Sequence, residues 1–227
     1  MAPLAIDLFC GLGGWTEGLL AEGWGVVGFD IECHVYGGHR YPAQLVIQDV
    51  LTLHGSQFRS ADLIVASPPC QEFSYMAMPW TRAKEKRRRL LDGPAADRAR
   101  LTALFDACFR IQREASEAAG RHVPMVVENV RGAQEWVGRA RWSFGSFYLW
   151  GDVPALLPMD AGVRKGKGSG GSWYYQNGGN ARSASSKSAE RREWSAKIAK
   201  VPLPLSRHVA RCFLPHQKSF VSHPRLV

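Results

Sequence analysis

The stretch Leu4-Ala5-Ile6-Asp7-Leu8-Phe9-Cys10-Gly11-Leu12-Gly13-Gly14 decides the fold. Its apolar first half predicts a short buried strand, and a helix-like segment from Trp15 to Glu22 follows it. The glycines between strand and helix permit a tight turn and let a ligand approach the backbone closely. The stretch therefore predicts a strand–turn–helix unit with a nucleotide-binding turn.

The alternation of strand-like and helix-like segments continues along the first half of the chain. Further apolar runs predict strands at residues 25–29, 45–47, 63–66 and 123–127, and helical spacing marks residues 95–119. A later strand is expected at residues 144–150. Such alternation is typical of a mostly parallel sheet. We therefore expect an α/β, Rossmann-like fold with helices on both faces of the sheet.

Ligands of such folds bind at the carboxyl ends of the strands, and this chain places its unusual residues there. Asp30 follows the second predicted strand, where a carboxylate can accept both hydroxyls of a ribose. Asp49 follows the third and is placed to accept from an adenine amino group, with Ile31 and Val50 on the two faces of the ring. A nicotinamide dinucleotide and S-adenosylmethionine both satisfy this pattern.

Cys70 follows the fourth predicted strand within Ser67-Pro68-Pro69-Cys70-Gln71. The two prolines prevent helix formation and fix the backbone, so we expect a thiol held on a rigid loop. Glu128 follows the fifth predicted strand, and a carboxyl close to a thiol suits paired nucleophilic and acid chemistry. The five cysteines are widely spaced and form no C-x-x-C pair, so we expect neither a disulfide framework nor a zinc site.

The composition is that of one globular domain with a basic surface. The 227 residues carry a formal net charge of +9, which favours a polyanionic partner but also fits a merely solvated surface. No apolar run is long enough to cross a bilayer, and no basic leader precedes the first strand. We expect a cytoplasmic protein with no membrane partner and no metal.

Three blocks in this order, Asp7-Leu8-Phe9-x-Gly11-x-Gly13-Gly14, Pro69-Cys70-Gln71 and Glu128-Asn129-Val130, resemble the signature blocks of C5-cytosine-specific DNA methyltransferases. A fourth block, Val201-Pro202-Leu203-Pro204-Leu205 with Val209-Ala210, resembles the family's final motif. The resemblance covers roughly residues 4–150 and 195–214. The chain length is most like that of phage-borne or orphan members, and whether a restriction partner exists stays open.

The resemblance implies S-adenosylmethionine as cofactor and double-stranded DNA as partner, with a monomer as the acting species. It implies that Cys70 attacks a cytosine flipped out of the duplex, that Glu128 acts at N3 of the base, and that Arg139 and Arg141 contact it. The two arginines also fit a helix end, where cations are favourable. The implied cofactor contacts are Asp7, Phe9, Gly11, Gly13, Gly14, Asp30, Ile31, Asp49, Val50 and Pro69.

The same comparison suggests three parts of the chain. Residues 1–150 form the S-adenosylmethionine-binding catalytic domain, residues 151–194 a short basic, Gly/Ser-rich target-recognition segment, and residues 195–227 a C-terminal helix that returns to the domain. So short a target-recognition segment predicts a brief or relaxed target sequence. Residues 72–89 are placed like the family's mobile catalytic loop, and their basic run either follows phosphates or is a solvated face.

The chain departs from the family's pattern in two places. The Gln of Gln-x-Arg-x-Arg is missing before Arg139, and Ile198-Ala199-Lys200 replaces the Gly-Asn-Ser before the final motif. Lys200 either faces solvent or alters cofactor preference, for example toward a carboxylated derivative. An RNA (tRNA) cytosine-C5 methyltransferase shares these motifs and stays an alternative, as does a DNA-binding protein with altered cofactor use. A nicotinamide enzyme explains the glycine loop but not the later blocks.

Overall fold

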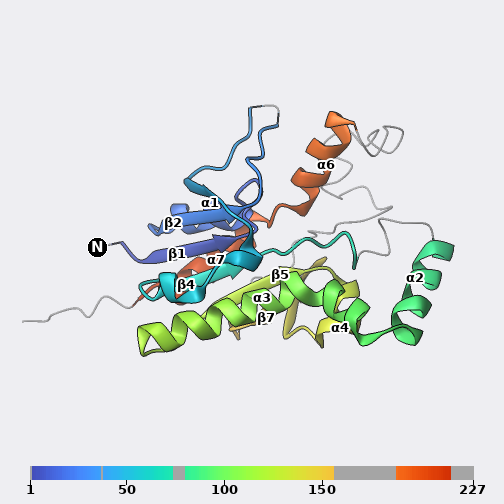
Figure 1. The fold of residues 1–227 in the computed structure, drawn as a ribbon. Helices are drawn as coiled ribbons and strands as arrows, with labels where there is room; N and C mark the ends of the chain where they lie inside the picture. The colour runs from blue at the N-terminus through green and yellow to red at the C-terminus, as the bar shows by residue number, and fades with distance from the viewer. Residues whose placement is uncertain (1, 37, 74–79, 156–187, 216–227) are drawn as a thin grey trace, which may run out of the picture.

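In this computed structural model, which describes residues 2–36, 38–73, 80–155 and 188–215, the strands form a seven-stranded sheet of order β3-β2-β1-β4-β5-β7-β6 (Figure 1). The parallel strands are β1 (Leu4–Leu8), β2 (Gly25–Asp30), β3 (Gln44–Ile47), β4 (Leu63–Ala66) and β5 (Met125–Asn129). The antiparallel hairpin β6 (Trp142–Phe144) and β7 (Phe147–Gly151) extends the sheet beyond β5. The predicted mostly parallel α/β sheet is confirmed.

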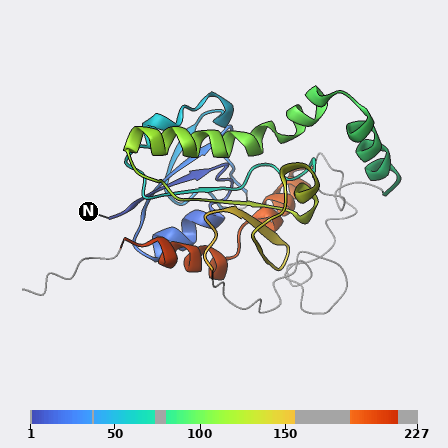
Figure 2. The same ribbon diagram turned by 90° about the horizontal axis from the view of Figure 1, so that it is seen from below.

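Helices cover both faces of this sheet, as predicted (Figure 2). α1 (Gly14–Ala21) and α7 (Leu203–Phe213) pack on one face, and α3 (Ala95–Ala119) packs on the other with the 3-10 turns η1 (Val50–Thr52) and η2 (Gly55–Phe58). The remaining elements are α2 (Trp80–Asp92), η4 (Arg131–Ala133), α4 (Gln134–Val137) and α6 (Ala189–Ala199). Among the helices of the described ranges, none is both long and apolar enough to cross a bilayer.

The central strand β4 explains why the sheet needs two layers of helices. All four of its residues are fully buried: Ile64 and Ala66 face the core beneath α3, while Leu63 and Val65 face the core beneath α1 and α7. A strand buried on both faces reads as a continuous apolar run rather than an alternating one. The run Leu63–Ala66 therefore marks the middle of the sheet.

The backbones of α1 and α7 touch at glycine positions. A Cβ added at Gly18 would lie 2.2 Å from Ser206 Oγ, and one added at Gly14 would lie 2.4 Å from the backbone N of Val201. At the far end of α1, the Glu22 carboxylate accepts a hydrogen bond from Arg207 of α7 and forms an ion pair with Arg211 of the same helix. This contact brings the residues just before α7 against the glycine loop.

Four predictions about elements need correction. The predicted strand Phe144–Trp150 is a hairpin, because the chain turns between β6 and β7. The predicted C-terminal helix is two helices, α6 and α7, since Pro202 lacks the N–H that would continue α6. Part of the predicted catalytic loop is helical, as α2. The fifth strand begins at Met125 and includes Glu128.

Most of the target-recognition segment, residues 156–187, lies outside the described residues, as do residues 216–227.

Candidate active site

A cavity of about 660 Å³ opens at the carboxyl ends of β1, β2, β4 and β5. It lies where the strand order reverses around β1 and β4, the position at which open α/β sheets bind ligands. The strand-end loops and the segment before α7 both contribute to its walls. Of the residues predicted to act in catalysis or cofactor binding, those that line it are Phe9, Gly11, Gly14, Asp30, Ile31, Asp49, Pro69, Cys70 and Glu128.

The glycine loop is held in shape by the next strand. Phe9 has a φ of 57°, the left-handed conformation that few non-glycine residues adopt, and its side chain lines the cavity. Gly11 N donates a hydrogen bond of 2.9 Å to Asp30 Oδ2. Gly13 does not line the cavity. Its φ is 78° and a Cβ there would lie 2.5 Å from Pro42 Cδ, so glycine is required for the turn itself.

Asp30 lies at the acidic end of the cavity, and His34 lies beside it. Asp30 Oδ1 accepts a hydrogen bond of 2.8 Å from Ile31 N and lies 3.5 Å from His34 Nε2. Burial raises the pKa of Asp30, but hydrogen bonds from His34 and Gly11 outweigh burial, so the pKa is lowered overall. Asp30 is therefore a carboxylate acceptor facing the cavity.

The apolar contacts of the nucleoside site differ from the prediction at one residue. Ile31 lines the cavity and is 67% exposed, as expected for a residue that a ligand would cover. Val50 is fully buried in the core with α3 and does not line the cavity, because η1 begins there and turns its side chain inward. Leu51, 48% exposed, lines the cavity beside Asp49 instead.

Asp7 is not among the residues that line the cavity, and its predicted role as a cofactor contact stays a prediction. Its Oδ2 accepts a 2.6 Å hydrogen bond from Thr16 Oγ1, which lies 2.6 Å from the Tyr41 hydroxyl. Its Oδ1 is buried with no hydrogen-bond partner among the described residues. Asp7 thus braces β1 against α1 beneath the glycine loop.

Burial is the main cause that raises the pKa of Asp7 from 3.8 to about 8, and the nearby charge of Asp30 adds to it. The folded protein therefore binds this proton more tightly than the unfolded chain does. Below pH 3.8 both states are protonated and the residue costs nothing, whereas stability falls as the pH rises from 3.8 toward 8.

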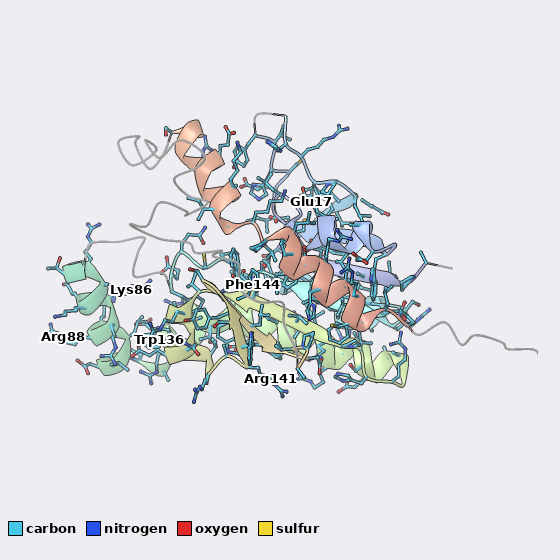
Figure 3. The ribbon with its side chains drawn as sticks, turned by 180° about the vertical axis from the view of Figure 1, so that it is seen from behind. Glu17, Lys86, Arg88, Trp136, Arg141 and Phe144 are labelled. Atoms are coloured by element: carbon cyan, nitrogen blue, oxygen red, sulfur yellow. The ribbon has the colours of Figure 1, made fainter. Side chains whose placement is uncertain are left out.

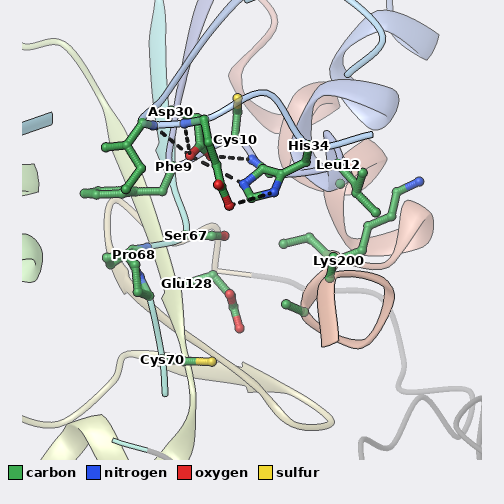
Figure 4. A pocket seen from close by; sticks show the side chains of 18 of the residues that line it. Phe9, Cys10, Leu12, Asp30, His34, Ser67, Pro68, Cys70, Glu128 and Lys200 are labelled. Atoms are coloured by element: carbon green, nitrogen blue, oxygen red, sulfur yellow. Dashed lines mark hydrogen bonds and ion pairs between the residues drawn. The ribbon is translucent and has the colours of Figure 1, made fainter. Parts of the chain in front are cut away.

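Cys70 and Glu128 enter the same cavity from two neighbouring strands (Figure 4). Cys70 is half-buried in the loop after β4, and Glu128 is buried within β5. Asn129 Nδ2 donates a 2.9 Å hydrogen bond to the backbone oxygen of Pro68, and Trp15 Nε1 donates one of 3.0 Å to Ser67 Oγ. The first bond fixes the Cys70 loop to the strand that carries Glu128, and the second fixes it to α1.

The helix α2, at one end of the molecule, carries basic side chains that include Lys86 and Arg88 (Figure 3). Lys86 Nζ pairs with the Glu72 carboxylate and donates a 2.9 Å hydrogen bond to its backbone oxygen. Arg87 Nε donates a 2.5 Å hydrogen bond to Glu135. Arg82, Arg88 and Arg89 on the same helix are exposed. The Lys86 pair fastens α2 to the segment that follows Cys70, and the Arg87 pair fastens it to α4.

Arg139 and Arg141 are not brought into the cavity. Both are exposed in the segment between α4 and β6, and neither is among the residues that line the cavity. Arg141 N donates a 2.8 Å hydrogen bond to Leu149 O within the hairpin region, and Figure 3 shows Arg141 at the edge of the molecule. Their predicted contact with a target base stays a prediction.

Sequence reasoning missed or left open several residues on the cavity walls. Arg192 of α6 and Lys200 line it opposite the acidic end, and Lys200 Nζ pairs with Glu17 of α1 instead of facing only solvent. His34 also lines it and was not predicted, although its place four residues after Asp30 offered a signal. No group of three or more His, Cys, Asp or Glu side chains in the described ranges could hold a metal ion.

The chain resembles solved methyltransferase structures at low identity. It is similar to a presumed DNA modification methyltransferase encoded within an E. coli prophage (22% identity over 60% of this chain and 35% of that one, TM-score 0.40). It is also similar to the Dnmt2 methyltransferase of S. pombe (17%, 61% and 37%, TM-score 0.37) and to the Entamoeba histolytica methyltransferase EhMeth (14%, 74% and 58%, TM-score 0.41). The matches span between 35% and 58% of the length of these proteins. No curated protein sequence matches the chain.

Residues 4–92 match the family model of C-5 cytosine-specific DNA methylases. The matched range contains the glycine loop, Asp30, Asp49 and the Cys70 loop, which are the strand-end parts that meet in the cavity, and it ends before Glu128. Over residues 4–92 the chain is therefore similar to the C-5 cytosine-specific DNA methylases.

Proposed function

We propose that the protein transfers a methyl group from S-adenosylmethionine to C5 of cytosine in DNA, with Cys70 as nucleophile and Glu128 as acid. One observation carries the proposal. The half-buried Cys70 thiol and the buried Glu128 carboxyl line the same cavity as Asp30 and Asp49, whose carboxylates suit a nucleoside. Neither the thiol nor the acids alone require this chemistry. Their meeting at the switch point of the sheet supports it.

The cavity fits the nucleoside part of the cofactor. Its volume of about 660 Å³ falls within the usual range for small-ligand sites. Asp30 would accept from the ribose hydroxyls and Asp49 from the adenine amino group, while Ile31 and Leu51 offer apolar surface to the ring. Once bound there, the cofactor supplies an electrophilic methyl group on a sulfonium.

The protein residues make cytosine C5 reactive. The Cys70 thiolate adds to C6, and the electron pair of the C5–C6 bond moves through the ring toward N3, where Glu128 donates a proton. C5 thereby becomes an enamine-like carbon that accepts the methyl group. A base then removes the C5 proton, elimination breaks the Cys70–C6 bond, and N3 returns its proton to Glu128, which restores the aromatic ring.

A cytosine in a duplex reaches this cavity only after it leaves the base stack. The exposed arginines of α2, Arg82, Arg88 and Arg89, lie on an element fastened to the Cys70 segment through Lys86 and Glu72. Phosphate contacts from such a surface would hold the duplex beside the cavity. The net charge of +9 agrees with a polyanionic substrate.

The test is methyl transfer from labelled S-adenosylmethionine to duplex DNA and, in parallel, to tRNA. We expect label in 5-methylcytosine of DNA from the wild type and from Cys212→Ala, whose cysteine is exposed on α7. We expect none from Cys70→Ala. Label in tRNA alone would establish the RNA alternative, and absence of label from both substrates would refute the proposal.

A second measurement tests the covalent step. In DNA that carries 5-fluorocytosine, C5 holds fluorine where a proton must leave, so elimination cannot occur and the Cys70 adduct accumulates. We expect a denaturation-resistant protein–DNA complex from the wild type and Cys212→Ala but not from Cys70→Ala. A complex that persists in Cys70→Ala would assign the nucleophile to another residue.

A further inference from the structure

We propose that His34 positions the cofactor by binding one ribose hydroxyl jointly with Asp30, which makes it a specificity-determining residue of the nucleoside site. The inference rests on the proposed function, because it assumes that a ribose occupies this end of the cavity. The match to the family does not assign His34 a role.

The imidazole lies beside the carboxylate, at a distance that is long for a hydrogen bond. His34 Nε2 lies 3.5 Å from Asp30 Oδ1, and both side chains line the cavity (Figure 4). Asp30 already accepts Gly11 N on one oxygen and Ile31 N on the other, yet each carboxylate oxygen has a second lone pair. A hydroxyl that approaches both groups from the cavity can use that lone pair and the ring N–H together.

The surroundings keep protons on the ring. Asp30 faces Nε2, and Glu32 Oε1 lies 3.4 Å from Nδ1, so a carboxylate stands beside each nitrogen. The Nδ1 atom is buried and makes no hydrogen bond of good geometry in the described structure. Interaction with Asp30 is the main cause that raises the pKa of His34. A raised pKa favours the protonated imidazole, in which both nitrogens are donors.

A donor next to an acceptor matches a hydroxyl better than either does alone. A ribose hydroxyl has one proton to give, which Asp30 accepts, and lone pairs to receive, which His34 N–H satisfies. A ligand without the hydroxyl leaves both groups unpaired, and such a loss discriminates strongly between ligands. Tyr36 stacks on the imidazole, with ring centroids 6.0 Å apart and planes 29° apart, and so orients the ring.

The test measures binding of S-adenosylhomocysteine and its 2′-deoxy and 3′-deoxy analogues by isothermal titration calorimetry. The proteins are the full-length wild type, His34→Ala, His34→Gln and His39→Ala. His39 is an exposed residue of the same segment and does not line the cavity, so its variant reports on general disturbance of that segment. Glutamine retains an N–H donor and is expected to restore part of the affinity.

We expect His34→Ala to bind S-adenosylhomocysteine about tenfold or more weakly, as for loss of a hydrogen bond to a charged group. One deoxy analogue should bind the wild type more weakly, but should bind His34→Ala little more weakly than S-adenosylhomocysteine does, because both changes remove the same contact.

If the wild type binds S-adenosylhomocysteine and His34→Ala binds it equally well, the inference fails alone. It also fails alone if both deoxy analogues weaken binding to the wild type and to His34→Ala by the same factor. If the wild type binds none of the three ligands, the proposed function fails and the inference falls with it.

Discussion

Replacing Gly18 with alanine should destabilise the fold, although alanine normally favours a helix. Gly18 lies in the middle of α1, where the added methyl group would gain about 0.5–1 kcal/mol of helix stability at an open site. Here its Cβ would lie 2.2 Å from Ser206 Oγ and 2.5 Å from both Arg207 N and Ser206 C. Two of these three atoms are backbone, so α1 and α7 must move apart to accommodate the methyl group.

Overpacking of this kind costs about 1–3 kcal/mol. After the helix gain of about 0.5–1 kcal/mol is subtracted, the net loss is about 1 kcal/mol at the middle of both ranges and at most about 2.5 kcal/mol. Urea unfolding followed by circular dichroism measures this free energy of unfolding. Removing the Ser206 hydroxyl in the double variant Gly18→Ala/Ser206→Ala should restore only part of the loss, because the backbone atoms of Ser206 and Arg207 remain in the way.

The matched control is Gly25→Ala. Gly25 has no positive φ, and the nearest atom to its added Cβ is Pro3 O at 3.8 Å, an ordinary contact distance. We expect this variant to stay within about 0.5 kcal/mol of the wild type. Wild-type stability in Gly18→Ala, or full recovery in the double variant, would refute the claim that the two backbones are in contact.

Three further changes test the site and its surface. Asp7→Asn should flatten the decline in unfolding free energy between about pH 4 and 8, because the buried carboxyl no longer ionises; parallel wild-type and variant profiles in urea unfolding would contradict this. Glu128→Gln should lower the methyl-transfer rate about 10²- to 10⁴-fold while S-adenosylhomocysteine affinity stays unchanged, because the amide cannot transfer a proton. Arg88→Ala should weaken DNA binding about equally across sequences and reduce the slope of log K against log salt concentration by about 1, and an unchanged slope would exclude a phosphate contact.

The apolar pattern of the sequence predicts those strands and helices whose residues are buried in the core. The apolar runs at Leu63–Ala66 and Leu4–Leu8 lie between two layers of helices, and α3 occupies the residues that helical spacing predicts. The hairpin of β6 and β7 escaped prediction because a three-residue strand with exposed Trp142 and Ser143 has almost no apolar pattern. Helix α2 escaped because its basic residues make its periodicity a matter of charge rather than burial.

The sequence indicates which candidate site residues lie at strand ends, but not the direction in which each side chain points. Strand order alone brings Asp30, Cys70 and Glu128 to one edge of the sheet, so a sequence that places them after strands already implies their proximity. Whether Val50 or Leu51 faces the cavity depends on where η1 begins, and a 3-10 turn of three residues has no periodic signature. Asp7 is predicted to contact the cofactor because it precedes the glycines, and alternation along β1 turns it toward Thr16.

The two walls of the cavity come from opposite ends of the chain, and this separates the factors that control binding from those that control chemistry. Cys70 and Glu128 are fixed by bonds within the sheet and its loops, such as Asn129 to Pro68. Lys200 on the other wall depends on the contact between α1 and α7 and on its pair with Glu17. Loosening that helix contact therefore displaces a binding wall while the thiol and the carboxyl stay in register. The loss should appear first in the affinity for the cofactor and only secondarily in the rate of the covalent step.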